Sequence, residues 1–146
     1  MKKLILFLSI ALVFTTFTQC KKYPDGPAIS FRGKAERVAN TWKVTKYMED
    51  NVDKTSDFNN VYTSYILTTT KSGDYTISYK FMGTLAYNEA GSWKFDSSKK
   101  NLILTQSSPN NGTVTTWQIL KLYEKEMWVR DIDNNGKVIE AHLIPQ

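Results

Sequence analysis

About eight strand-like segments, each followed closely by a turn, constrain this chain more than any other feature. The segments are residues 41–49, 61–70, 74–82, 85–88 continued by 91–95, 102–106, 113–123, 127–132 and 137–144. The breaks between them are rich in Gly, Asn, Asp, Ser and Pro, and include Asn135-Gly136, a pair that favours tight hairpins. Because these connections are too short for helical crossovers, consecutive strands should pair antiparallel.

The hydrophobic pattern of the strands indicates one buried and one solvated face. Residues 74–82 alternate cleanly between aromatic or aliphatic and polar side chains. Residues 113–123 are ambiguous, because Trp117 and Ile119 compete with Leu120 and Leu122 for the inner face. A meander of this kind removes its edges by closing. We therefore predict an all-β fold, a single antiparallel up-and-down β-barrel of about eight strands, preceded by a short N-terminal helix within residues 30–40.

The first residues of the chain have the pattern of an export signal. Lys2 and Lys3 precede an uninterrupted apolar run at residues 4–14. As a helix, this run would span about 16 Å, roughly half of a membrane's hydrocarbon core. It is therefore too short to cross a membrane stably and has the length of a secretory signal.

Cys20 follows this run in the sequence TTFTQCKK of residues 15–22. The arrangement resembles the bacterial lipoprotein signal, in the loose form typical of Bacteroidota. The resemblance implies that the chain is cut before Cys20, whose thiol and new amine are acylated and anchor the protein to a membrane. Two acyl chains give effectively permanent anchoring. The alternative is an ordinary secreted protein with a free Cys.

The positive charge of the chain lies almost entirely outside the expected barrel. We divide the sequence into a signal peptide at 1–19, a lipidated Cys and tether at 20–34, and a barrel domain at 35–146. The formal charge of the whole chain is +5, whereas residues 35–146 carry equal numbers of basic and acidic side chains. Nucleic-acid binding normally requires a basic surface, so we do not expect a nucleic-acid partner.

The order of several short motifs over residues 35–146 resembles a known domain. NTWKV at 40–44, GSWKF at 91–95, WQILKL at 117–122 and MWV at 127–129 are similar in order and spacing to the lipocalin-like domain of Bacteroidota lipoproteins. This resemblance implies a small barrel whose interior binds an apolar molecule. It also implies that Trp42 packs at the closed end of the barrel against an Arg from a late strand, for which Arg130 is the candidate.

Aromatic side chains on the expected inner faces could line a pocket. The candidates are Trp42, Lys46, Tyr75, Tyr79, Trp93, Phe95 and Trp117. Lys46 shares parity with Trp42 and Val44, so its ammonium points inward unless a bulge intervenes, and a ligand's acid group could then pair with it. The alternative is a filled core with Lys46 at the rim; small barrels allow both outcomes.

The remaining candidate sites favour structural roles. Residues 131–136 match the first half of a calcium-binding loop, but position twelve is His142, so a hairpin turn is the better interpretation. His142 should face away from the core, and Glu124 with Glu126 should form a solvated corner. We find no catalytic triad, phosphate loop or metal-ligand cluster. We therefore expect no enzyme activity, no metal and no cofactor.

Two functions remain open at the level of sequence. The first is a cell-envelope lipoprotein whose barrel binds a small hydrophobic or amphipathic ligand. The alternative is a non-enzymatic structural or protein-interaction module with a filled barrel and no ligand. In both cases we expect anchoring to the outer membrane at its periplasmic face, because Lys21-Lys22 does not resemble an acidic surface-export signal.

Overall fold

A computed structural model describes residues 32–146 of the chain, which form two short helices and nine strands. The predicted signal peptide, Cys20 and most of the tether lie outside the described residues. The elements in chain order are α2 (Lys34–Val38), β1 (Asn40–Glu49), β2 (Val52–Asp53), α3 (Thr55–Val61), β3 (Tyr62–Thr69), β4 (Asp74–Phe81), β5 (Leu85–Phe95), β6 (Asn101–Ser108), β7 (Val114–Leu122), β8 (Met127–Ile132) and β9 (Val138–Pro145).

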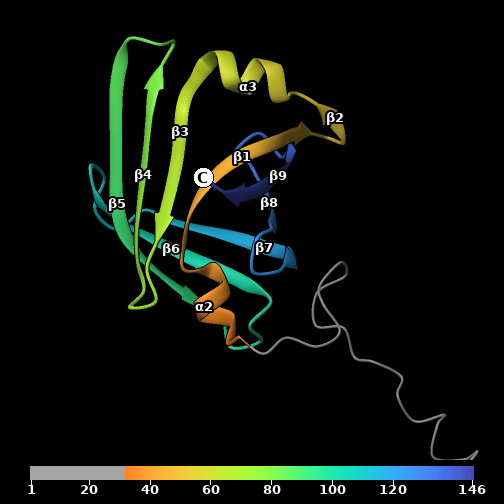
Figure 1. Ribbon diagram of the computed structural model, residues 1–146. Helices are drawn as coiled ribbons and strands as arrows, with labels where there is room; N and C mark the ends of the chain where they lie inside the picture. The colour runs from red at the N-terminus through yellow and green to blue at the C-terminus, as the bar shows by residue number, and fades with distance from the viewer. Residues whose placement is uncertain (1–31) are drawn as a thin grey trace, which may run out of the picture.

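The strands form one closed antiparallel sheet. Each strand from β3 to β9 pairs with its neighbour in sequence, and β1 pairs with both β3 and β9 (Figure 1). Strand β2 is a two-residue addition that pairs with the end of β1. The predicted eight-stranded up-and-down barrel is therefore confirmed. The predicted segments also match the observed strands to within two residues at nearly every boundary.

The sheet has register shifts in four strand pairs, and the shifts in β1 and β7 affect the residues of the core and the cavity. In β1 the register against β9 shifts between Val44 and Lys46, and in β7 the register against β8 shifts between Ile119 and Lys121. A bulge adds one residue and so reverses the alternation of faces beyond it. This explains the ambiguous pattern of β7, because Ile119 before the shift and Leu122 after it both belong to the main hydrophobic core.

Helix α2 closes one end of the barrel, as Figure 1 shows. The Trp42 indole donates to the Val38 carbonyl oxygen at 2.8 Å, and the Thr69 hydroxyl donates to the same oxygen at 2.5 Å. These two bonds satisfy a carbonyl that the helix end would otherwise leave unpaired. Arg37 is buried and donates from Nη1 to the Leu122 carbonyl at 2.6 Å. The helix is thus fastened to β1, β3 and β7.

The expected contact between Trp42 and Arg130 is wrong. Trp42 lies fully buried at the closed end, as expected. Arg130, however, alternates with the buried Val129 and so faces outward, where its Nη2 lies 2.8 Å from Glu140 Oε2. The buried Arg at this end is Arg37, which comes from the helix before the first strand rather than from a late strand.

The opposite end of the barrel is more open because β1 and β3 separate there. They pair only over Asn40–Trp42 and Leu67–Thr69, and β1 then continues along β9 alone. Helix α3, which the sequence analysis did not predict, lies at this end (Figure 1) and inserts Phe58 as its one buried residue. Neither helix in residues 32–146 has the length and apolar character needed to cross a membrane.

Gly91 provides a test of how tightly β5 is packed. It pairs with Tyr75 of β4, and a Cβ at this position would meet the Thr105 carbonyl oxygen and a Tyr75 ring carbon at 2.7 Å or less. We expect Gly91→Ala to lower the free energy of unfolding by about 1–3 kcal/mol or more, because β5 or the Tyr75 ring must move. Urea denaturation measures this change.

Gly33→Ala is the matched control for this prediction. A Cβ at Gly33 makes contacts no closer than 3.7 Å, and the backbone does not require glycine there. Its unfolding midpoint should remain close to that of the parent protein. Equal midpoints for the two variants would contradict the steric argument.

Candidate functional site

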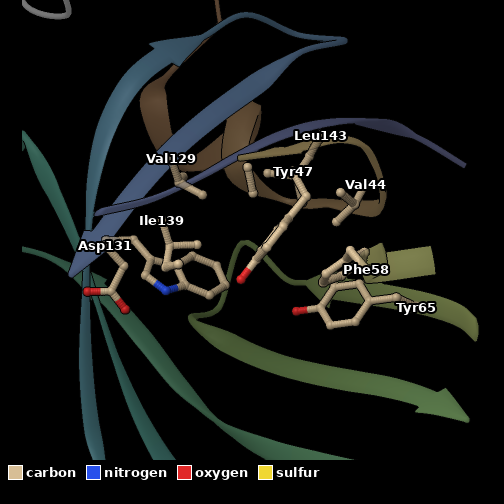
Figure 2. Close-up of a pocket in the computed structure, with 10 residues that line it drawn as sticks. Val44, Tyr47, Phe58, Tyr65, Val129, Asp131, Ile139 and Leu143 are labelled. Atoms are coloured by element: carbon tan, nitrogen blue, oxygen red, sulfur yellow. The ribbon is translucent and has the colours of Figure 1, made fainter. Parts of the chain in front are cut away.

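A cavity of about 260 Å³ lies inside the barrel, towards the open end. Ten side chains from β1, α3, β3, β7, β8 and β9 line it, and Figure 2 draws all of them: Val44, Tyr47, Phe58, Tyr65, Trp117, Val129, Asp131, Ile139, Ala141 and Leu143. Drug-sized ligands usually occupy roughly 300–1,000 Å³. The cavity therefore suits a smaller molecule.

Aromatic rings form one wall of the cavity. The rings of Tyr47 and Phe58 stack with their centroids 4.6 Å apart, and Tyr65 meets Phe58 edge-on at 5.4 Å. The cluster continues through Tyr79, which stacks on Tyr65 at 6.0 Å and on Tyr87 at 4.8 Å. Such offset and edge-on pairs contribute roughly 0.5–1.5 kcal/mol each beyond their burial. The wall is therefore held in place by mutual packing of its rings.

A second hollow, of about 430 Å³, lies in the gap where β1 and β3 separate. Val44, Phe58 and Tyr65 line both this hollow and the cavity. These three side chains therefore stand between the cavity and the outside of the barrel. The gap therefore adjoins the cavity without an intervening strand.

Asp131 is the charged side chain of the cavity. Among the ten lining residues it alone carries a formal charge at neutral pH. Figure 2 shows its carboxylate across the cavity from Phe58 and Tyr65. Its Oδ1 accepts a hydrogen bond from the neighbouring Ile132 amide at 2.7 Å, and within residues 32–146 it forms no ion pair. The carboxylate therefore has acceptor capacity left for another partner.

A second carboxylate, Glu89, lies on the same inner surface beyond the aromatic wall. It accepts hydrogen bonds from the hydroxyls of Tyr75 at 2.6 Å and Tyr87 at 3.3 Å. Gln106, which is buried, extends this network to the Tyr87 hydroxyl at 3.5 Å. Glu89 faces the interior because it lies directly opposite Ile77 in the β4–β5 pair, and paired residues point to the same side of the sheet. The sequence analysis did not identify this residue.

Burial and nearby negative charge keep the interior tyrosines protonated. Burial raises the pKa of Tyr47 to about 12, with a further contribution from the charge of Glu49. Burial also raises the pKa of Tyr65, and the charge of Glu89 acts in the same direction. Tyr75 has a raised pKa because of its burial and its hydrogen bond to Glu89. The tyrosines therefore offer neutral hydroxyls and uncharged rings at physiological pH.

The structure places five of the seven expected pocket residues in three different surroundings. Trp117 lines the cavity. Trp42, Tyr75 and Trp93 are buried core residues, and the Trp93 indole donates to the Thr70 carbonyl at 3.0 Å. Tyr79 belongs to the aromatic cluster next to the cavity wall.

Phe95 lies elsewhere, at the closed end. It packs against the core and lines a surface hollow beside α2. The sequence therefore identified the inner face of β5 correctly but did not reveal how far along the barrel each residue lies.

Lys46 does not line the cavity. The bulge between Val44 and Lys46 brings Tyr47 to the inner face, and Lys46, its neighbour along the strand, consequently faces outward. Without the bulge, the ammonium group of Lys46 would point into the barrel; with it, the side chain of Tyr47 does. Asp131 could have been found from sequence, because it shares parity with Met127 and Val129. Nothing in the sequence indicated that Phe58 belongs to the site, because its helix has only seven residues, too few to show a helical repeat of hydrophobic positions.

Two further expectations concern the β8–β9 hairpin. Of the calcium-like residues 131–136, the first two end β8 and the rest form the hairpin turn, in which Asp133 Oδ1 accepts from the amides of Asn135 and Lys137. His142 faces outward as expected, but its ring stacks on Trp128 at 3.9 Å and is bonded to Glu140. No cluster of three or more potential metal ligands occurs among the described residues.

Comparison with solved structures shows what kind of barrel this is. A lipocalin-like protein from Bacteroides uniformis aligns with 75% of this chain and 99% of its own, with a TM-score of 0.52 and 10% identity. A redesigned β-barrel aligns with 81% of this chain and 99% of its own, with a TM-score of 0.51 and 11% identity. The fold is lipocalin-like. No known family and no curated protein matched the sequence.

The lipocalin-like fold accounts for the two unequal ends of the barrel. Such barrels of about eight strands have an interior just wide enough to be filled by side chains or to hold one small ligand. Here the closed end is filled by the core around Trp42, and the open end keeps a cavity. The barrel thus combines a filled half with a half that keeps a cavity, and of the seven expected pocket residues only Trp117 lines that cavity.

Alkaline titration tests the environment of the cavity tyrosines. A folded-state pKa above the usual value of about 10 means that these groups stabilise the fold below pH 10, and that this stabilisation is lost as the pH rises. We expect tyrosinate absorbance to appear in two phases, with Tyr47 ionising near pH 12. Tyr47→Phe should remove part of the late phase.

The protein unfolded in guanidinium is the control for this titration. There all eight tyrosines should ionise together near pH 10. A folded protein that also titrates in one phase near pH 10 would show that the wall is open to water.

Proposed function

We propose that this protein is a non-enzymatic lipoprotein of the cell envelope whose lipocalin-like barrel binds a small hydrophobic or amphipathic molecule. The observation that carries the proposal is the cavity at the open end of the barrel, lined by four aromatic side chains, five aliphatic ones and one carboxylate. A largely apolar cavity with a few convergent polar groups is the usual form of a small-molecule site.

The gap between β1 and β3 supports a binding role because it gives the cavity a route of entry. Three residue pairs hold these strands together, whereas β1 and β9 pair over seven positions. A barrel selected purely for rigidity would gain from continuous pairing at this seam. Helix α3, a separate short element, borders the gap through Phe58 and Asn59.

The envelope assignment is supported by the sequence of residues 1–22 rather than by the barrel. A basic start, an eleven-residue apolar run and a single Cys in a lipoprotein-like context point to export and acylation. The first described residues lie beside α2, at the closed end of the barrel (Figure 1). We place the anchored protein at the periplasmic face of the outer membrane.

A second candidate function is an interaction module that uses the outside of the barrel. The hairpin between β4 and β5 supports it, because Met82 is 64% exposed and Leu85 is 68% exposed. Large apolar side chains that project into solvent together often mark an interface. This candidate requires no occupant in the cavity, and the two functions are therefore separable by experiment.

The cavity predicts a specific fluorescence and mass signature. Protein purified from its producing cell should carry a small molecule in native mass spectrometry. Rebinding of the extracted molecule should quench tryptophan fluorescence, because Trp117 lines the cavity. Ala141→Phe should abolish binding, since the added ring occupies space next to Leu143 and Ile139.

Trp117→Phe is the control for this assay, because it should retain the bound mass and lose most of the quenching. A protein that is empty in the mass spectrum, with equal fluorescence for parent and Ala141→Phe in the presence of lipophilic probes, would favour the interaction module instead.

If Cys20 carries the lipid anchor, replacing this one residue should change the cell fraction in which the protein is found. Cys20→Ala should move the protein from the membrane fraction to the soluble fraction and remove the diacylglycerol mass from its N-terminal peptide. Lys22→Ala, close to the same site, should stay in the membrane fraction. Retention of Cys20→Ala in the membrane would refute lipidation.

A further inference from the structure

We infer that the cavity selects a compact organic cation, such as a molecule with a trimethylammonium or alkylammonium group. This inference rests on the proposed binding function and concerns the charge of the ligand. Its basis is the combination of electron-rich ring faces with an unpaired carboxylate in one small cavity.

The ring faces of the cavity are suited to a positive charge. Tyr47, Phe58, Tyr65 and Trp117 all line it. Each ring has negative charge density on its face, and such faces attract a cation within about 6 Å of the ring centre. Trp and Tyr interact more strongly than Phe, and three of these four rings are of those types. Because the tyrosines are protonated, their rings carry no formal charge, and their hydroxyls remain available as hydrogen-bond donors or acceptors to polar groups of a ligand.

Asp131 fixes the sign of the preferred charge. It forms no ion pair within residues 32–146, and it is the charged member of the lining. A neutral molecule that filled the cavity would remove water from this carboxylate without replacing it, which costs free energy. A ligand cation placed between Asp131 and the aromatic wall would offset that cost. An anion would add like-charge repulsion.

No basic side chain of the described interior could reverse this preference. Arg37 is buried at the closed end and donates to the Leu122 carbonyl, and the buried ammonium of Lys34 belongs to the same helix α2. The bulge in β1 turns Lys46 outward. Lys137, close to the open end, is paired with Glu49 at 3.0 Å.

Nearby carboxylates extend the negative potential around the cavity. Glu89 lies close enough to raise the pKa of Tyr65, and Glu49 and Asp133 act in the same way on Tyr47. The three carboxylates already accept hydrogen bonds from other groups of the protein, so they would act on a ligand through their electrostatic field and not by direct contact. Glu89 and Asp131 thus both add negative charge to this half of the interior, whereas the charge of Glu49 is offset by its ion pair with Lys137.

Three probes of nearly equal shape test the inference. Choline, 3,3-dimethylbutan-1-ol and 3,3-dimethylbutanoate share a compact branched head and differ in charge. We expect choline to bind the full-chain protein at least about tenfold more tightly than the alcohol, and the carboxylate not to bind measurably. Competition with tryptophan quenching, or calorimetry, measures the three dissociation constants.

Variants locate the origin of the preference. Asp131→Asn keeps the acceptor for the Ile132 amide and should reduce choline affinity roughly tenfold while leaving the alcohol unchanged. Glu124→Gln removes the same charge at an exposed turn at the other end of the barrel and should change neither. Tyr65→Leu should weaken choline more than the alcohol. Thermal unfolding checks that each variant is folded.

The outcomes distinguish this inference from the function on which it rests. If the alcohol or the carboxylate binds as well as choline, the inference is wrong and a binding function stands. If none of the three binds at millimolar concentration while native mass spectrometry still detects an occupant, the inference is likewise wrong. An empty cavity in every assay overturns both.

Discussion

The pairing of β1 with β9 is the constraint on which the rest of this structure depends. It converts a meander into a closed barrel and covers both edges of the sheet. On one edge β1 pairs with β9 from Trp42 to Glu49, whereas on its other edge it pairs with β3 at only three positions before the two strands separate. The barrel is therefore tight at the end where both pairings coexist and open at the other. The positions of the core, of α3 and of the cavity all follow from this division.

Two local irregularities then determine the chemistry of the interior. The bulge in β1 brings Tyr47 rather than Lys46 to the inner face of the barrel. The bulge in β7 allows both Ile119 and Leu122, an odd- and an even-numbered residue, to join the core. This register shift in β1 decides which charge lies inside: Lys46 would have brought a cation into the cavity, whereas the observed lining has Tyr47 and the carboxylate of Asp131. The proposed preference for cations depends on this difference.

The strands were predictable because each carries its own pattern and its own turn. Residues 74–82 alternate without interruption, and Asn135-Gly136 marks the last hairpin, so local sequence was sufficient there. The environment of Trp42 was predictable only in part. The pattern of its own strand indicates that it is buried, but its hydrogen-bond partner, the Val38 carbonyl, comes from helix α2. Tyr47 and Phe58 could not have been assigned to the site, because a bulge and a short helix leave no period in the sequence. Asp131 could have been, from its parity with Val129.

The stability of helix α3 is coupled to the occupancy of the cavity. The helix has seven residues, too few to be stable alone, and Phe58 is its one buried anchor. Phe58 is also part of the cavity wall, where it stacks on Tyr47. Docking of the helix and filling of the cavity therefore draw on the same side chain and are thermodynamically linked. Any occupant that contacts Phe58 protects α3 from local unfolding, and amide exchange in α3 becomes a measure of occupancy.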